Sequence, residues 1–214
     1  MDRIDIRDIR REQLVKATIG SIALRGFAKT TLSQVASHAH LSHGIVNFYF
    51  KSKDDLLIAT LQHMFNEYDA YSVAAVERAG QSPVSRLTAL VDVDFDPAVV
   101  NREKVTVWYA FWGETRWRKD FLKLCSSWSN NYFERVRGVV QNVIDFGGYS
   151  RLDAGVIARG LVAMLDGLWL DVLINGDTSV PAARLSIQSY LAGIFPNEFG
   201  QKQRRSSVKT GKKK

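Results

Sequence analysis

Apolar residues recur every three or four positions along most of the chain, which is the spacing of amphipathic helices. The first such segment runs from about residue 6 to residue 25, with Gly26 at its end as a helix stop. Alternating apolar and polar residues between tight hairpin turns, the pattern of strands, are absent from the sequence. The sequence therefore predicts an all-α protein, with further helices from Ser52 onward and over residues 83–93, 97–113, 118–146, 151–174 and 181–194.

Two short helices are predicted between residues 26 and 57. Thr30 or Thr31 can cap the first of them, and Ser42 can cap the second. Residues 39–41 have the length of a tight turn between two helices. Together with the first long helix, this pattern predicts a three-helix helix-turn-helix domain.

The start of the second short helix carries residues suited to the DNA major groove. Ser42, His43 and Gly44 are small or polar, which lets the backbone approach the base pairs closely. Asn47 can pair with a base edge, and Phe48 can contact a thymine methyl group. The alternative is a buried helical hairpin with no role in DNA binding. The full set expected to contact DNA, phosphate contacts included, is Thr31, Ser33, Ser42, His43, Gly44, Asn47, Phe48, Tyr49 and Lys53.

The same stretch resembles the DNA-binding domain of the TetR family of transcriptional regulators. The block SHGIVNFYFKSKDDLL is most similar to the choline-responsive repressors of betaine pathways within that family. The sequence departs from the common family pattern at His40, Ile45 and Asn47, and His40 occupies a turn position that usually holds Gly. The resemblance implies a homodimer that binds a palindromic operator and responds to a small molecule. The matching residues are Gly26-Phe27, Thr30, Val35-Ala36, Leu41-Ser42-His43-Gly44, Phe48-Tyr49-Phe50 and Ser52-Lys53-Asp54-Asp55-Leu56.

Charge divides the chain into three parts, although the formal net charge is +7. Residues 1–53, the predicted helix-turn-helix domain, carry +5, and residues 54–198 carry −5. The larger, acidic part is expected to be a helical ligand-binding and dimerisation domain. Residues 199–214 carry +7 and no acidic residue, so we expect a disordered tail that contacts polyanions without sequence preference. A basic head on an acidic body fits a nucleic-acid module joined to a part with a different partner.

Several classes of protein are disfavoured by composition. Only one cysteine, Cys125, is present, and no apolar run reaches the roughly 18–20 residues of a membrane helix. The charged N-terminus does not resemble a secretion signal, so a cytoplasmic protein without membrane contact is expected. Phosphate-binding loops, nucleophile elbows and zinc-protease helices are absent, so neither an enzyme nor a cofactor is expected. His38, His40 and His43 are wrongly spaced for a metal site on one helical face.

The N-terminal arm allows two interpretations. Its arginines can clamp phosphates or reach a minor groove, or they can form ion pairs on the surface of a helix. The basic residues are Arg3, Arg7, Arg10 and Arg11, interleaved with Asp2, Asp5, Asp8 and Glu12.

All five tryptophans lie beyond residue 100, in the acidic part. Aromatic faces grouped with a carboxylate are suited to a quaternary ammonium, which donates no N–H hydrogen bond. The segments WYAFWGE and LDGLWLD are also similar to parts of the choline-sensing repressors. Core packing of these aromatics, or an uncharged hydrophobic effector, are the alternatives. The predicted ligand-binding residues are Trp108, Phe111, Trp112, Asp166 and Trp169.

The last two long helices, over residues 151–174 and 181–194, would form the dimer interface that the resemblance implies. Two paired heads also match a palindromic operator better than one small head. The same residues can instead form the core of a single chain, and sequence does not separate the two roles. The apolar or small residues available are Ala158, Leu161, Val162, Leu165, Leu185, Ile187 and Leu191.

Overall fold

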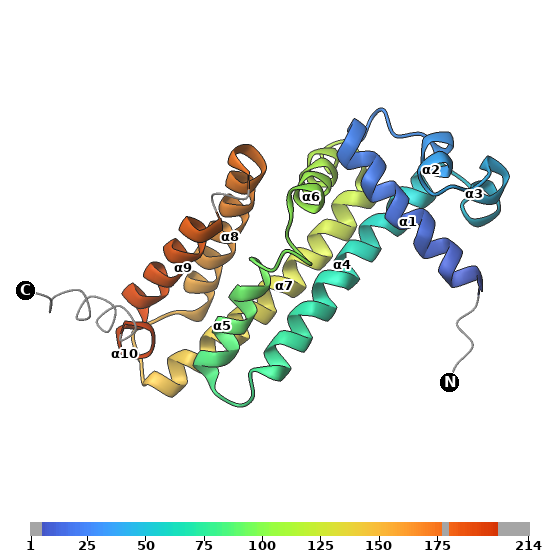
Figure 1. Ribbon diagram of the computed structural model, residues 1–214. Helices are drawn as coiled ribbons and strands as arrows, with labels where there is room; N and C mark the ends of the chain where they lie inside the picture. The colour runs from blue at the N-terminus through green and yellow to red at the C-terminus, as the bar shows by residue number, and fades with distance from the viewer. Residues whose placement is uncertain (1–5, 177–179, 201–214) are drawn as a thin grey trace, which may run out of the picture. The chain divides into compact units, whose positions relative to one another are not determined.

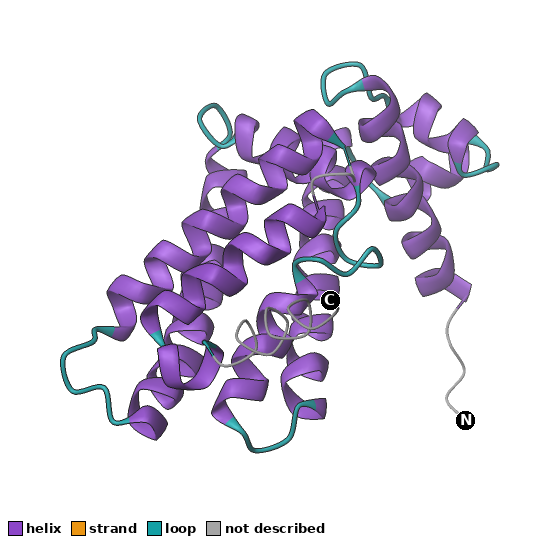
Figure 2. Cartoon of the chain, turned by 60° about the vertical axis from the view of Figure 1, so that its left-hand side comes forward, coloured by secondary structure: helices purple, strands orange, loops and turns teal. Residues whose placement is uncertain are grey.

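The computed structural model describes residues 6–176 and 180–200, and every regular element within these ranges is a helix (Figures 1 and 2). The prediction of an all-α protein is confirmed. The helices are α1 (Ile6–Arg25), α2 (Leu32–His38), α3 (His43–Tyr49), α4 (Lys53–Arg78), α5 (Pro83–Val93), α6 (Arg102–Glu114), α7 (Lys119–Gly147), α8 (Ala154–Asn175), α9 (Val180–Ile194) and α10 (Pro196–Phe199).

The chain forms two compact units. The first unit contains residues 1–70 and 101–129, and therefore α1, α2, α3 and α6 with the first parts of α4 and α7. The second unit contains residues 71–100 and 130–214, and therefore α5, α8, α9 and α10 with the remainder of α4 and α7. Within the first unit α1 packs against both α2 and α6, and within the second α9 packs against α8 and α10.

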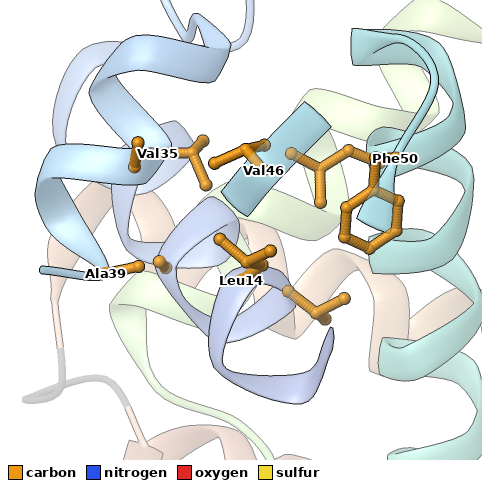
Figure 3. Packing of buried hydrophobic residues seen from close by; sticks show 9 residues of the cluster. Leu14, Val35, Ala39, Val46 and Phe50 are labelled. Atoms are coloured by element: carbon orange, nitrogen blue, oxygen red, sulfur yellow. The ribbon is translucent and has the colours of Figure 1, made fainter. Parts of the chain in front are cut away.

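A small apolar core holds the first three helices together. Leu14 of α1, Val35 of α2 and Val46 of α3 are each fully buried, and Phe50 closes the cluster after α3 (Figure 3). Burying side chains of this size contributes about 1.5–3 kcal/mol each. The side-chain amide of Gln13 also donates to the backbone oxygen of Ala39, at 2.8 Å. The core and this hydrogen bond fix α2 and α3 on α1.

The turn between α2 and α3 depends on His40, which has a φ of 55°. A left-handed backbone at a residue with a Cβ costs about 1 kcal/mol relative to Gly. Thr31 caps α2 through a capping box with Gln34, in which each side chain accepts a backbone N–H. Ser42 occupies the N-cap of α3, but its hydroxyl makes no capping hydrogen bond. The predicted helix-turn-helix is therefore present, with one capping bond fewer than expected.

Two helix starts differ from the sequence-based expectation. The helix predicted over residues 97–113 begins only at Arg102, because the Asn101 side chain accepts the backbone N–H of Lys104 at 2.9 Å and caps it there. Residues 97–99 form a turn instead. The helix predicted from residue 151 begins at Ala154, where the Asp153 side chain provides the cap. In both cases the N-cap residue, rather than the apolar periodicity, sets the first residue of the helix.

Parts of two expectations lie outside the described residues. These are the arm residues Asp2, Arg3 and Asp5 and the basic tail over residues 201–214. Among the described helices, none combines the length and apolarity that crossing a membrane requires.

Candidate nucleic-acid interface and effector site

Helix α3 presents one face to solvent, which carries polar side chains and one exposed aromatic ring. Val46 points into the head core, which turns His43, Asn47 and Phe48 outward, and the Phe48 side chain is 75% exposed. The Ser42 hydroxyl lies at the start of this face. Exposed polar groups at the first turn of the second helix are what major-groove contact requires.

Gly44 lies in the first turn of α3 and is exposed. A Cβ built on Gly44 would meet only the Ser42 hydroxyl oxygen, at 3.9 Å, among the described residues. The fold therefore does not need a glycine here. Because Gly44 has no side chain, the backbone of α3 is open to a binding partner at this position.

The other predicted DNA-contacting residues lie around this face. Ser33 of α2 is exposed, and its hydroxyl oxygen is 3.5 Å from Nδ1 of His43. Tyr49 is half-buried, with its ring edge against Phe48 at a centroid distance of 5.2 Å. Thr31 is exposed while its hydroxyl serves the capping box.

Lys53 begins α4, and its ammonium group is held against the turn after α1. Nζ donates to the backbone oxygen of Phe27 at 3.4 Å and lies 5.8 Å from the centroid of the Phe27 ring. The predicted phosphate-binding lysine is thus connected to the end of α1.

The described part of the N-terminal arm makes contacts within the head. Arg10 donates to the side chain of Gln13 at 2.7 Å, and the Arg11 guanidinium lies 4.8 Å from the Phe50 ring centroid. Glu12 pairs with Lys16 at 2.6 Å, and this contact lowers the pKa of the Glu12 carboxyl. Glu12 thus forms a helix-surface ion pair, while Arg10 and Arg11 contact an amide and an aromatic ring.

A group of stacked rings, the tryptophan cluster, joins α4, α6 and α7 within the first unit. Trp128 stacks on Phe65 with ring centroids 4.8 Å apart and on Trp108 at 5.3 Å. Trp112 contacts Trp108 at 5.9 Å, and Tyr68 meets Trp128 edge-on at 5.5 Å. Trp108 and Trp112 were predicted from the sequence, whereas Phe65, Tyr68 and Trp128 were not, because their contacts are between helices that are distant in sequence.

Phe111 makes a different set of contacts from its neighbours on α6. It is fully buried and meets Phe27 edge-on at 5.4 Å and Phe121 at 5.5 Å. The Arg118 guanidinium lies over both of those rings, at 5.5 and 5.1 Å, and pairs with Asp54 at 2.6 Å. Helix α6 therefore reaches the tryptophan cluster and the head within one helical turn.

The other two predicted ligand residues belong to the second unit. Trp169 is 4% exposed, and its Nε1 donates to the backbone oxygen of Asp94 at 3.3 Å. Asp166 lies on the exposed side of α8, although desolvation by the surrounding protein raises the pKa of its carboxyl to about 6.

Asp94 itself is buried, and the Tyr132 hydroxyl donates to its Oδ2 at 3.4 Å. Asp94 and Tyr132 were not predicted from the sequence, although an acidic residue within the apolar stretch LVDVDF is a usable signal.

Comparisons with known proteins agree with both parts of this arrangement. Residues 14–60 match the family model of bacterial regulatory proteins of the tetR family. Residues 83–196 match the C-terminal domain of BetI-type transcriptional repressors. The chain belongs to the TetR family.

Relatives and solved structures extend this assignment over most of the chain. The HTH-type transcriptional regulator BetI of Paraburkholderia phymatum is 33% identical to this TetR-family protein, over 83% of this chain and 88% of that one. A transcriptional regulator from Pseudomonas aeruginosa PAO1 has the same fold, with a TM-score of 0.78, 22% identity and coverage of 91% and 94%. A regulator from Saccharomonospora viridis, solved in complex with choline, has a TM-score of 0.76, 21% identity and coverage of 86% and 96%. The protein is thus a TetR-family transcriptional repressor of the BetI type.

Helices α8 and α9 of this TetR-family repressor keep an exposed face of small and apolar residues. On α8 this face is 72% exposed at Val156 and 67% at Ile174, with Ala163, Gly167 and Leu170 also exposed between them. On α9, Leu185 is 57% exposed. The remaining residues that sequence analysis offered for an interface are buried within the chain, namely Ala158, Leu161, Val162, Leu165, Ile187 and Leu191. Their burial belongs to the core of the single chain.

Proposed function

We propose that this repressor binds a palindromic operator as a homodimer, and that a small cationic, choline-like effector lowers its operator affinity. The protein's membership of the BetI-type repressors supports the general mechanism. The proposed DNA contacts are those of α3 and its surroundings, with Asn47 and Phe48 at base edges and Lys53 at a phosphate.

One observation carries the link between effector and operator: α6 touches the tryptophan cluster through Trp108 and the head through Phe111. Phe111 packs on Phe27, whose backbone oxygen holds the ammonium group of Lys53 at the start of α4. A shift of α6 on effector binding therefore displaces the end of α1 and the start of α4 together. Close packing transmits such a shift, because packed rings have few alternative arrangements.

The chemistry of the predicted ligand residues supports a cationic effector. Trp108 and Trp112 of the first unit supply aromatic faces, and aromatic faces attract quaternary ammonium groups. The solved regulator of the same fold that contains choline adds support for this class of effector. A complete switch of the population from operator-competent to incompetent requires about 5.5 kcal/mol of differential binding.

The exposed face on α8 and α9 supports the homodimer. Its occupant is proposed to be the same face of a second copy, because a two-fold dimer buries one patch against itself. Two heads related in this way match the two halves of a palindrome on successive major grooves. Light scattering of the wild type should give the mass of two chains, and Ile174→Glu should shift it to one by placing a charge on this face.

Operator binding tests the proposed function directly. The purified protein is titrated against its own upstream DNA and against a random duplex of equal length at physiological salt. We expect a clear preference for the upstream duplex and a loss of that binding when choline is added. No preference between the two duplexes would refute the repressor, and release by an uncharged hydrophobic compound but not by choline would refute the cationic effector.

A further inference from the structure

Asp94 is a carboxylate buried in the second unit, where it ends α5 as the C-cap residue. Only 3% of its surface is exposed. Aspartate is rarely buried to this extent, because removing a carboxylate from water is costly unless another group stabilises the charge. Such a residue needs a specific chemical reason for its position.

Two aromatic residues from other helices fix Asp94 in place. The Tyr132 hydroxyl on α7 donates to Oδ2 at 3.4 Å, and Trp169 Nε1 on α8 donates to the backbone oxygen at 3.3 Å. Tyr132 and Trp169 are themselves buried, at 6% and 4% exposure. Three helices thus bring together one carboxyl group and two aromatic side chains.

A neighbouring cation, Arg184, is engaged with other groups of the same segment. Arg184 forms an ion pair with Asp92, and its guanidinium lies 5.0 Å from the ring centroid of Phe95. Asp92 and Asp94 are therefore in different surroundings although they are two residues apart. Asp92 is partly exposed and pairs with an arginine, and Asp94 is buried and accepts a hydrogen bond from Tyr132.

We propose that Asp94, with Tyr132 and Trp169, holds the cationic group of a quaternary ammonium effector. This inference rests on the proposed function, and it names the residue that selects the charge of the effector. A quaternary ammonium offers no N–H donor, so the protein binds it through charge and through the negative faces of aromatic rings. A buried carboxylate acts strongly in this role because little water screens it, and Asp94 is only 3% exposed.

The test compares choline with neohexanol, the neutral alcohol in which carbon replaces the choline nitrogen. Calorimetry of the full-length protein measures both affinities in the wild type, Asp94→Asn and Asp96→Asn. Asn keeps the shape of Asp94 and an oxygen for the Tyr132 hydroxyl, while it removes the charge. Asp96→Asn removes the same charge two residues away, at an exposed position. A melting curve and operator binding without effector establish that each variant is folded.

We expect the wild type and Asp96→Asn to prefer choline by about tenfold or more, and Asp94→Asn to lose that preference. If Asp94→Asn does not fold, Asp94→Gln and Asp94→Glu form a second pair that differs only in charge. An undiminished preference for choline in the Asn or Gln variant would overturn the role of Asp94. A wild type that does not distinguish the two alcohols would instead overturn the cationic effector of the proposed function. Loss of preference in Asp166→Asn alone would assign the charge to Asp166 and refute the inference.

Discussion

Gly44→Ala is expected to move the stability of the fold and the affinity for the operator in opposite directions. Gly44 is in the first turn of α3, and the added Cβ would lie 3.9 Å from the Ser42 hydroxyl oxygen, an ordinary van der Waals distance. Ala is a better helix former than Gly by up to about 1 kcal/mol in a helix interior, and by less at a first turn. The melting temperature should therefore rise by about 1–3 °C.

The Cβ methyl group that Gly44→Ala adds would also lie between the α3 backbone and DNA. If the backbone approaches the major groove at Gly44, the methyl group separates the protein from one base or phosphate contact. A good base contact is worth about 1–3 kcal/mol, so operator affinity should fall by about tenfold. Fluorescence anisotropy with a labelled operator measures the change in operator affinity, and thermal melting measures the change in stability.

Gly138→Ala is the matched control, because Gly138 is an exposed glycine in the middle of α7, and a Cβ added there would meet no described atom within 4 Å. It should stabilise the fold without changing operator affinity. If Gly44→Ala leaves operator affinity within about twofold of the wild type, the proposed approach of DNA to α3 at this residue is refuted.

Three further predictions concern phosphate contact, coupling and pH. Lys53→Ala should weaken binding to operator and random DNA alike and reduce the slope of log affinity against log salt by about 0.9, measured by anisotropy at several salt concentrations; a change confined to the operator would contradict it. Phe111→Leu removes two edge-to-face ring contacts, with Phe27 and Phe121, and should destabilise the fold by about 2 kcal/mol. In the folded Phe111→Leu variant the effect of choline on operator affinity should shrink, and an unchanged effect would argue against coupling through α6. Asp166→Asn should melt at a higher temperature than the wild type above about pH 6, because desolvation by the surrounding protein raises the pKa of Asp166 from 3.8 to about 6 and the folded state disfavours its charge. That difference should disappear below about pH 4, where the carboxyl is protonated in both states, and a difference that is constant with pH would refute this cause.

The helix-turn-helix was predictable because its determinants are local. Thr31 and Gln34 form a capping box three residues apart, and the positive φ of His40 is required by a turn of fixed length. The start of α6 was not predictable in the same way. Pro97 is acceptable in the first turn of a helix and Asn101 as an N-cap, and the hydrogen bond from the Lys104 backbone N–H to the Asn101 side chain decides between the two starts.

The grouping of the candidate effector residues depended on tertiary contacts. Tyr132 is 38 residues from Asp94, and Trp169 is 75 residues from it, so no spacing rule connects the three. Phe111 lies on the face of α6 that sequence analysis assigned to the ligand, yet its partners are Phe27 and Phe121. Helical periodicity identifies which residues share a face, but not which neighbour that face meets.

The contact between Phe111 and Phe27 limits how such repressors can be recombined. A chimera that exchanges residues 1–53 for the head of another regulator replaces Phe27 but retains Phe111, Phe121 and Arg118. The donor head must therefore bring a ring of matching size to the end of α1, or the hybrid inherits a cavity beside α6. Residues 1–53 and the rest of the chain are for this reason not interchangeable parts, and a designer who wants a different head must choose the donor by its fit to α6.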